Sequence, residues 1–266
     1  MINVAVKEVD AKAFNDAVNN IIATSNRDMK EVVNQQGKLL AIELMNYTPP
    51  FAGGKVPKGE ASKTTKGDQR QGMEAVKRDI LRTMTPPSEL FKMGFKNKWL
   101  EKVVKSKDDK KIQQYFESVK SPILNKYKVA QFDPQLHLSK RVYSNRFRPK
   151  YQYKFVSNEG FVKKYIKEMQ GRVGYMKAGW AVAAQFFGAT IPKWIEDHLY
   201  YAKGEVKILN EDPTNYSVEM ANYTPTIDRH ASSYNVAIRM RTNALNRAFD
   251  NYLEKTLKES FTYAGK

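Results

Sequence analysis

Apolar residues recur every three or four positions near the start of the chain, and this spacing constrains the fold more than any other feature. Such a stripe runs along one side of an amphipathic helix, so we expect a long helix from about Asp10 to Met45. Asp10 is the expected N-cap residue, and Gly37 is the expected point of a bend or break. The helix must end before Pro49, because proline lacks an amide hydrogen and restricts the residue before it. The stripe consists of Phe14, Val18, Ile21, Met29, Val32, Leu40 and Leu44.

Later patterns predict further helices and a few strands. Apolar and polar residues alternate at 205–209 and at 216–221, and 210–215 has the composition of a turn, so a β-hairpin is expected there. Alternation also indicates an irregular strand or hairpin arm at 140–155. The expected fold class is therefore α+β and helix-rich. Helices are expected at 67–84, 107–118, 159–170, 175–187 and 232–260.

Aromatic residues among small ones predict a close-packed core near residues 180–194. Trp180, Phe186, Phe187 and Trp194 stand beside several alanines, a composition typical of closely packed helices. All four side chains are expected to be largely buried. The substitution Phe186→Ala is then expected to cost about 3 to 5 kcal/mol of the free energy of unfolding.

The chain is strongly basic, with 45 Lys and Arg against 28 Asp and Glu, a formal net charge of +17 over 266 residues. An excess of this size predicts an anionic partner or neighbour. Part of the charge lies in a polar segment at 51–66, which has few apolar residues and is expected to be mobile until a partner orders it. Its candidate contact residues are Lys55, Lys58 and Lys63. Assembly should therefore protect these lysines from trypsin.

The segment 140–155 interleaves cations with aromatic residues and contains no acidic residue. Cations neutralise phosphates and aromatic rings stack on bases, so single-stranded nucleic acid suits this segment. Two other interpretations stand beside that one: the segment docks on an acidic protein surface, or it is a strand with one solvated basic face and aromatic residues in the core. The candidate contact residues for DNA or a partner protein are Lys140, Arg141, Arg146, Arg148, Lys150, Tyr151 and Tyr153.

Several chemistries lack the residues they need. The chain has no cysteine, which excludes disulfides, thiolate metal sites and a cysteine nucleophile. His137, His198 and His230 are far apart in the sequence and lack the local pairing usual in metal sites. We therefore assign no catalytic, cofactor-binding or metal-binding residue, and we expect neither an enzyme nor a cofactor. The longest apolar run, 178–189, is shorter than the roughly 20 residues that span a bilayer, so no membrane partner is expected.

Three patches of the sequence resemble neck and tail-completion proteins of tailed bacteriophages. The first is the end of a helix and a Thr-Pro turn at 41–50, AIELMNYTPP, which leads into a Gly-rich loop. The second, VEMANYTP at 218–225, resembles a strand that ends in an asparagine, an aromatic residue and a proline, with a helix after it at 237–257. The third combines 171–180 with 192–195 and looks like a helix of larger phage virion proteins.

This resemblance implies a single domain at 1–266 in which long amino- and carboxy-terminal helices pack on a small antiparallel sheet. Residues 86–158 would be a helical basic insertion or arm within it. The implied function is that of a structural virion protein that forms a homo-oligomeric ring at the neck or the head-proximal end of the tail, for tail completion or head-to-tail connection. The implied partners are other virion proteins (portal, adaptor or tail tube) and packaged DNA. The implied locations are the virion and, during assembly, the host cytoplasm.

The charge supports an alternative from a different functional class. In this alternative the chain is a basic nucleic-acid-binding protein that uses the arm at 140–155, and ring formation has no part in its function.

Overall fold

The computed structural model describes most of the chain, and it groups the residues into two compact units. Unit 1 comprises residues 1–72 and 173–266, and unit 2 comprises residues 73–172. The insertion that the resemblance implies at 86–158 falls within the residues of unit 2. The described residues are 2–5, 12–25, 29–51, 64–84, 98–106, 108–120, 123–124, 129–139, 141–143, 149–151, 154–156, 159–212, 215–225 and 227–264.

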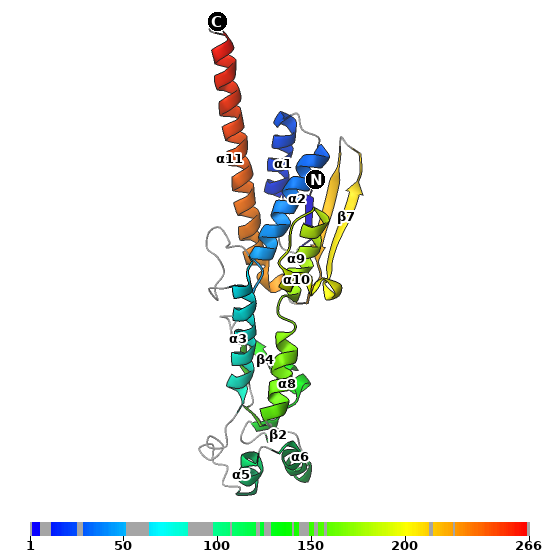
Figure 1. Ribbon diagram of the computed structural model, residues 1–266, viewed down its shortest axis with the longest axis vertical. Helices are drawn as coiled ribbons and strands as arrows, with labels where there is room; N and C mark the ends of the chain where they lie inside the picture. Colours follow the sequence, from blue (N-terminus) through cyan, green and yellow to red (C-terminus); the bar gives the residue numbers. More distant parts are fainter. Residues whose placement is uncertain are drawn as a thin grey trace. The chain divides into compact units, whose positions relative to one another are not determined.

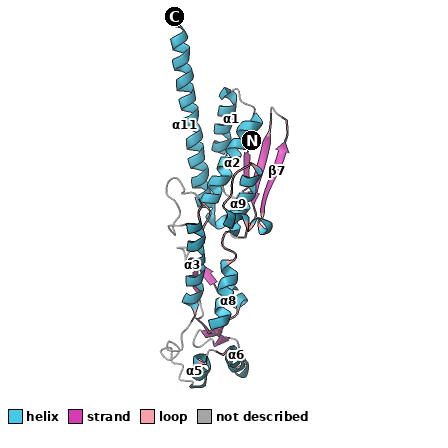
Figure 2. Cartoon of the chain, viewed as in Figure 1, coloured by secondary structure: helices cyan, strands magenta, loops and turns pink. Residues whose placement is uncertain are grey.

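Unit 1 contains a three-stranded sheet covered by helices (Figure 1). The central strand β8 (Ser217–Asn222) is antiparallel to β7 (Gly204–Asn210) and parallel to β1 (Ile2–Ala5). The expected hairpin is therefore confirmed, but the sheet is mixed rather than antiparallel, because β1 joins it in the parallel direction. Helix α9 (Tyr175–Phe186) packs on β7 and β8. The helix-rich α+β fold class is confirmed (Figure 2).

The amino-terminal helix is two helices, so the prediction of one helix over 10–45 is wrong. Helix α1 (Lys12–Ser25) ends well before Gly37, and α2 (Met29–Asn46) continues through it. Gly37 is buried within α2, where an added Cβ atom would lie 2.7 Å from the ring of Phe187. This glycine therefore permits close packing and does not break the helix. Residues 26–28 and the expected N-cap Asp10 lie outside the described residues.

The carboxy-terminal helix is confirmed as α11 (Ala231–Ala264), which packs on α1 and α2. The two terminal helical segments thus pack largely against each other, while α9 supplies the main cover of the sheet. Their shared core includes Leu40, Trp180 and Tyr234, each fully buried. Three short helices complete the described elements of unit 1: α10 (Lys193–Glu196), η2 (Leu199–Tyr201) and η3 (Ile227–His230).

Three of the four aromatic residues expected in the core are buried, and one is not. Trp180, Phe187 and Trp194 are buried, whereas Phe186 is 49% exposed. Consecutive helical residues point about 100° apart, so the two phenylalanines at the end of α9 face different surroundings. Phe187 takes the inner position against Gly37, and the expected burial of Phe186 is wrong.

Unit 2 contains a second small sheet and several helices. Strand β3 (Val129–Gln131) pairs antiparallel with β2 (Ile123–Leu124) and parallel with β6 (Lys154–Val156). Helix α3 (Lys66–Thr83) begins within unit 1 and continues into unit 2. The other helices of unit 2 are α5 (Lys98–Lys105), α6 (Asp109–Ser118), α7 (Pro134–Ser139) and α8 (Glu159–Gln170). The helices expected at 67–84, 107–118, 159–170 and 175–187 are therefore confirmed, with small differences at their ends.

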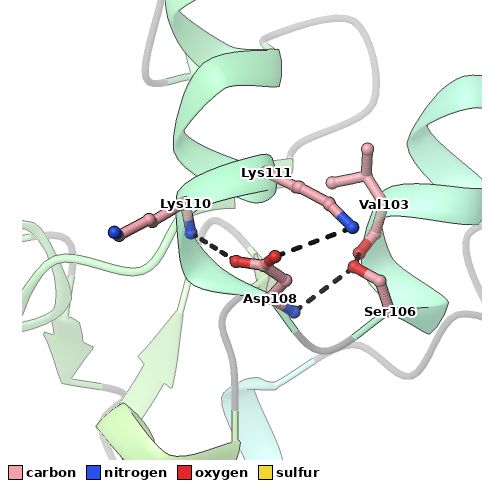
Figure 3. A network of polar contacts seen from close by, with 5 residues as sticks. All are labelled: Val103, Ser106, Asp108, Lys110 and Lys111. Carbon is pink, nitrogen blue, oxygen red and sulfur yellow. Dashed lines mark hydrogen bonds and ion pairs between the residues drawn. The ribbon is translucent and has the colours of Figure 1, made fainter.

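A polar network fixes the junction between α5 and α6 (Figure 3). The Asp108 carboxylate accepts a hydrogen bond from the Lys110 amide at 3.0 Å and caps α6, and it lies 3.7 Å from the Lys111 ammonium. The Ser106 hydroxyl donates to the Val103 carbonyl at the end of α5 and accepts from the Asp108 amide. Side-chain caps of this kind satisfy backbone groups that a helix end leaves unpaired. None of the described helices is long and apolar enough to cross a membrane.

Candidate polyanion-binding surface

The positive charge of the chain is concentrated in unit 2. Residues 73–172 contain 24 Lys and Arg against 10 Asp and Glu, a net charge of +14 over 100 residues. The 166 residues of unit 1 contain 21 Lys and Arg against 18 Asp and Glu, a net charge of only +3. A polyanion is therefore attracted to unit 2, and unit 1 is close to electrically neutral.

The arm expected at 140–155 is a β-hairpin where the structure describes it. Strand β4 (Arg141–Tyr143) pairs antiparallel with β5 (Pro149–Tyr151). Arg141 is opposite Tyr151 in the register, and Val142 is opposite Lys150. The structure therefore places the backbone of three candidate contact residues on one hairpin. The other candidates lie outside the described residues: Lys55, Lys58, Lys63, Lys140, Arg146, Arg148 and Tyr153.

Strand β6 follows the hairpin and fastens it to α3. Phe155 is fully buried and forms a parallel bridge with Met84, just beyond the end of α3. The Lys154 ammonium donates a hydrogen bond of 3.2 Å to the Arg82 carbonyl in the last turn of α3, where a cation also complements the helix dipole. Lys154 is three positions after Tyr151 in the chain, a separation of at most about 10 Å. The base of the hairpin therefore lies near the carboxy-terminal end of α3.

The exposed side of α3 is basic. An open depression of about 510 Å³ runs along it, lined by Glu74, Lys77, Arg78, Leu81 and Arg82. Three cations thus face one carboxylate, and Leu81 is 46% exposed between them. The opposite side of α3 carries Ile80, which is buried with Phe155 in the core of unit 2. The structure therefore brings a basic helix face and a basic hairpin to the same part of unit 2.

The pattern at 67–84 predicts a helix, but it does not mark these cations as a binding site. A signal was available: Arg78 and Arg82 are four residues apart, and residues with this spacing share one side of a helix. What the sequence alone does not show is that the last turn of α3 meets β6, which is 72 residues away in the chain at Lys154.

One buried lysine of unit 1 has a structural role instead. The Lys177 ammonium, on α9, donates to the Met45 carbonyl at 3.0 Å and to the Thr64 hydroxyl at 3.2 Å, and it is 1% exposed. Burial lowers the pKa of Lys177 from 10.5 to about 8, while the negative charge of Asp68 partly offsets this effect. Thr64 also donates to Asn46 through its amide and its hydroxyl. These bonds hold together the two ends of the segment 47–63.

The histidines do not form a metal site in the described part of the chain. His137 is buried in the aromatic core of unit 2, with its Nδ1 atom 3.4 Å from the Tyr165 hydroxyl. The ring of His198 packs edge-on against Tyr175. Among the described residues, no group of three or more His, Asp or Glu side chains is arranged to hold a metal ion.

Comparisons with known proteins do not identify the chain. No protein-family model, no curated protein and no solved structure matches it.

Proposed function

We propose that this chain is a structural protein of a tailed-bacteriophage virion, which forms a homo-oligomeric ring at the neck or the head-proximal end of the tail. In this ring, unit 1 makes the contacts between subunits and unit 2 binds an anionic neighbour. The observation that carries the proposal is the uneven charge, +3 in unit 1 and +14 in unit 2. The segments at 41–50 and 218–225, which resemble phage neck and tail-completion proteins, supply the virion setting.

Unit 1 exposes groups that are typical of protein interfaces. Strand β7 is at an edge of its sheet, and edge strands present unpaired backbone groups to a second chain. Leu209 on this strand is 50% exposed, and Tyr200 and Tyr223 are 89% and 55% exposed. The ring of Tyr201, the residue after Tyr200, stacks on that of Tyr175. Tyrosine is enriched at protein interfaces, and near-neutral surfaces associate without strong charge repulsion.

Mass photometry and negative-stain images of the full chain test ring formation. Wild type should form rings, alone or with portal, adaptor or tail-tube proteins. The triple variant Tyr200→Ser, Leu209→Ser, Tyr223→Ser should remain folded and monomeric, because all three side chains are exposed. A matched control, Phe161→Ser in unit 2, removes another exposed aromatic ring and should leave the rings intact. A wild-type chain that stays monomeric with every virion partner would overturn the proposal.

The second candidate function, a nucleic-acid-binding protein without a ring, is favoured by the basic hairpin β4–β5. Reversal of Arg146, Arg148 and Lys150 to Glu separates the two functions. If the arm docks on protein, the variant fails to assemble and neither form has measurable DNA affinity at physiological salt. If the arm binds DNA, the plot of log affinity against log salt flattens by about 0.7 to 0.9 for each phosphate that the variant no longer binds. Normal assembly with unchanged DNA binding would reject both functions for the arm.

A further inference from the structure

We propose that the basic face of α3, with the hairpin β4–β5 beside it, binds the phosphate backbone of duplex DNA. The inference rests on the part of the proposed function that gives unit 2 an anionic neighbour, and it names that neighbour. The residues that it adds are Lys77, Arg78 and Arg82, which line the open depression on α3. None of them belongs to the arm at 140–155.

The geometry of α3 suits a regular row of negative charges. Arg78 and Arg82 are one helical turn apart on the same side, about 6 Å along the axis at 1.5 Å per residue. Lys77 is the residue before Arg78 and also lines the depression. Among the described lining residues, the acidic one is Glu74, a turn earlier in the helix. The cationic end of the face is therefore the end that meets β6. A polyanion on this face therefore continues toward the hairpin.

Duplex DNA fits these features better than single-stranded nucleic acid or an acidic protein. Base stacking on aromatic rings is a main contribution to single-strand binding, and none of the described residues that line the α3 depression is aromatic. An acidic protein surface presents a local patch of charge, whereas unit 2 carries exposed lysines on α5, α6 and α8 as well as on α3. Cations spread over several rigid elements fit a long, uniformly charged backbone, which proteins bind through many separate phosphate contacts.

Lys154 has a different role from the cations of α3. Its ammonium is hydrogen-bonded to the Arg82 carbonyl, so it fixes β6, and with it the base of the hairpin, at the end of α3. The base of the hairpin is thereby held near the last turn of α3, which carries Arg82.

The test is the salt dependence of binding between the full chain and a duplex of about 30 base pairs, measured by fluorescence anisotropy. The variant Lys77→Gln, Arg78→Gln, Arg82→Gln removes three phosphate-binding cations, so the slope of log affinity against log salt should flatten by about 2.7. Between 50 and 200 mM salt, wild type should then lose roughly 40-fold more affinity than the variant. The control variant Lys203→Gln, Arg239→Gln, Arg247→Gln removes three exposed cations of unit 1 and should keep the wild-type slope.

Other results would overturn the inference. A wild-type slope in the α3 variant, or an effect on a single strand of the same sequence but not on the duplex, would show that α3 does not bind duplex DNA. Binding of polyglutamate without binding of the duplex at 50 mM salt would also show that α3 does not bind duplex DNA. Mass photometry of the same samples keeps this result separate from ring formation: a monomer with the expected slope supports the DNA surface and rejects the ring, and a ring without DNA affinity does the reverse.

Discussion

The contact between α9 and the sheet of unit 1 depends on a glycine, and Gly179→Ala should destabilise the protein although it adds a better helix former. A Cβ atom at position 179 would lie 2.3 Å from the Oδ1 atom of Asn222 on β8. The side chain of Asn222 is buried; it donates to the Met176 carbonyl at 2.9 Å and accepts from the Thr224 amide at 3.0 Å. The added methyl group therefore displaces an amide that is bonded on both sides.

Three effects set the magnitude of this change. Alanine in place of glycine stabilises a helix by about 1 kcal/mol. Overpacking in a close-packed interior costs about 1 to 3 kcal/mol, and each of the two hydrogen bonds of Asn222 contributes about 1 kcal/mol. The steric cost and the broken hydrogen bonds together exceed the helical gain, so a net loss of about 2 to 4 kcal/mol in the free energy of unfolding is expected.

Urea unfolding followed by tryptophan fluorescence measures this loss. A Trp99→Phe background removes the tryptophan of unit 2, so that Trp180 and Trp194, both buried in unit 1, report on its unfolding. Asn222→Ala clears the space that the added methyl group needs and already lacks the two hydrogen bonds. The double variant should therefore lose less stability than the sum of the two single variants, by about 3 to 5 kcal/mol. A Gly179→Ala variant as stable as its parent would refute the close approach of α9 and β8.

Two further predictions concern side chains already described in unit 1. Because burial lowers the pKa of Lys177 to about 8, the unfolded chain binds more protons than the folded chain between pH 8 and 10.5, so this group makes stability rise with pH in that window. From pH 7.5 to 9.5 the free energy of unfolding of wild type should rise by about 2 kcal/mol relative to that of Lys177→Met. Parallel pH profiles of the two proteins would contradict this prediction. Phe187→Ala should lower the free energy of unfolding by about 3 to 4 kcal/mol, because the ring of Phe187 packs on Gly37. Phe186→Ala should change the urea midpoint little, because Phe186 is 49% exposed. Equal losses of stability in the two variants would contradict the assignment of Phe187 to the inner position and Phe186 to the outer one.

Periodicity predicted the elements whose burial creates a pattern in the local sequence. The helices at 67–84, 159–170 and 175–187 and the hairpin β7–β8 have such patterns, and they are present. Strand β1 was not predicted because four residues are too few for a pattern and its partner β8 is more than 200 residues away. Phe186 was placed wrongly because spacing alone does not decide which of two adjacent aromatic residues faces the core.

The candidate surface was partly predictable for a related reason. A run of cations within 16 residues is visible in the sequence, so the arm at 140–155 was found. The cations of α3 lie among acidic and polar residues in the sequence. The hydrogen bond between Lys154 and Arg82 and the bridge between Phe155 and Met84 show that the end of α3 lies near the base of the hairpin. A surface assembled from distant segments therefore requires the fold, whereas a continuous segment does not.

Charge and core size together predict that unit 2 is the less stable part of the chain and that DNA stabilises it. Its described core consists of one cluster of six buried apolar residues and one of seven, whereas the described cluster of unit 1 has 26. A net charge of +14 adds self-repulsion, which a small core offsets poorly.

Amide hydrogen exchange of the full chain should therefore be faster in α8 than in α9 at low salt. Salt should slow exchange in α8 by screening, and duplex DNA at 100 times its dissociation constant should slow it about 100-fold by mass action if exchange requires release of the DNA. Exchange in α9 should respond little to either addition. Equal protection of α8 and α9 without DNA, or an unchanged α8 with it, would show that the charge of unit 2 is balanced within the fold rather than by a bound polyanion.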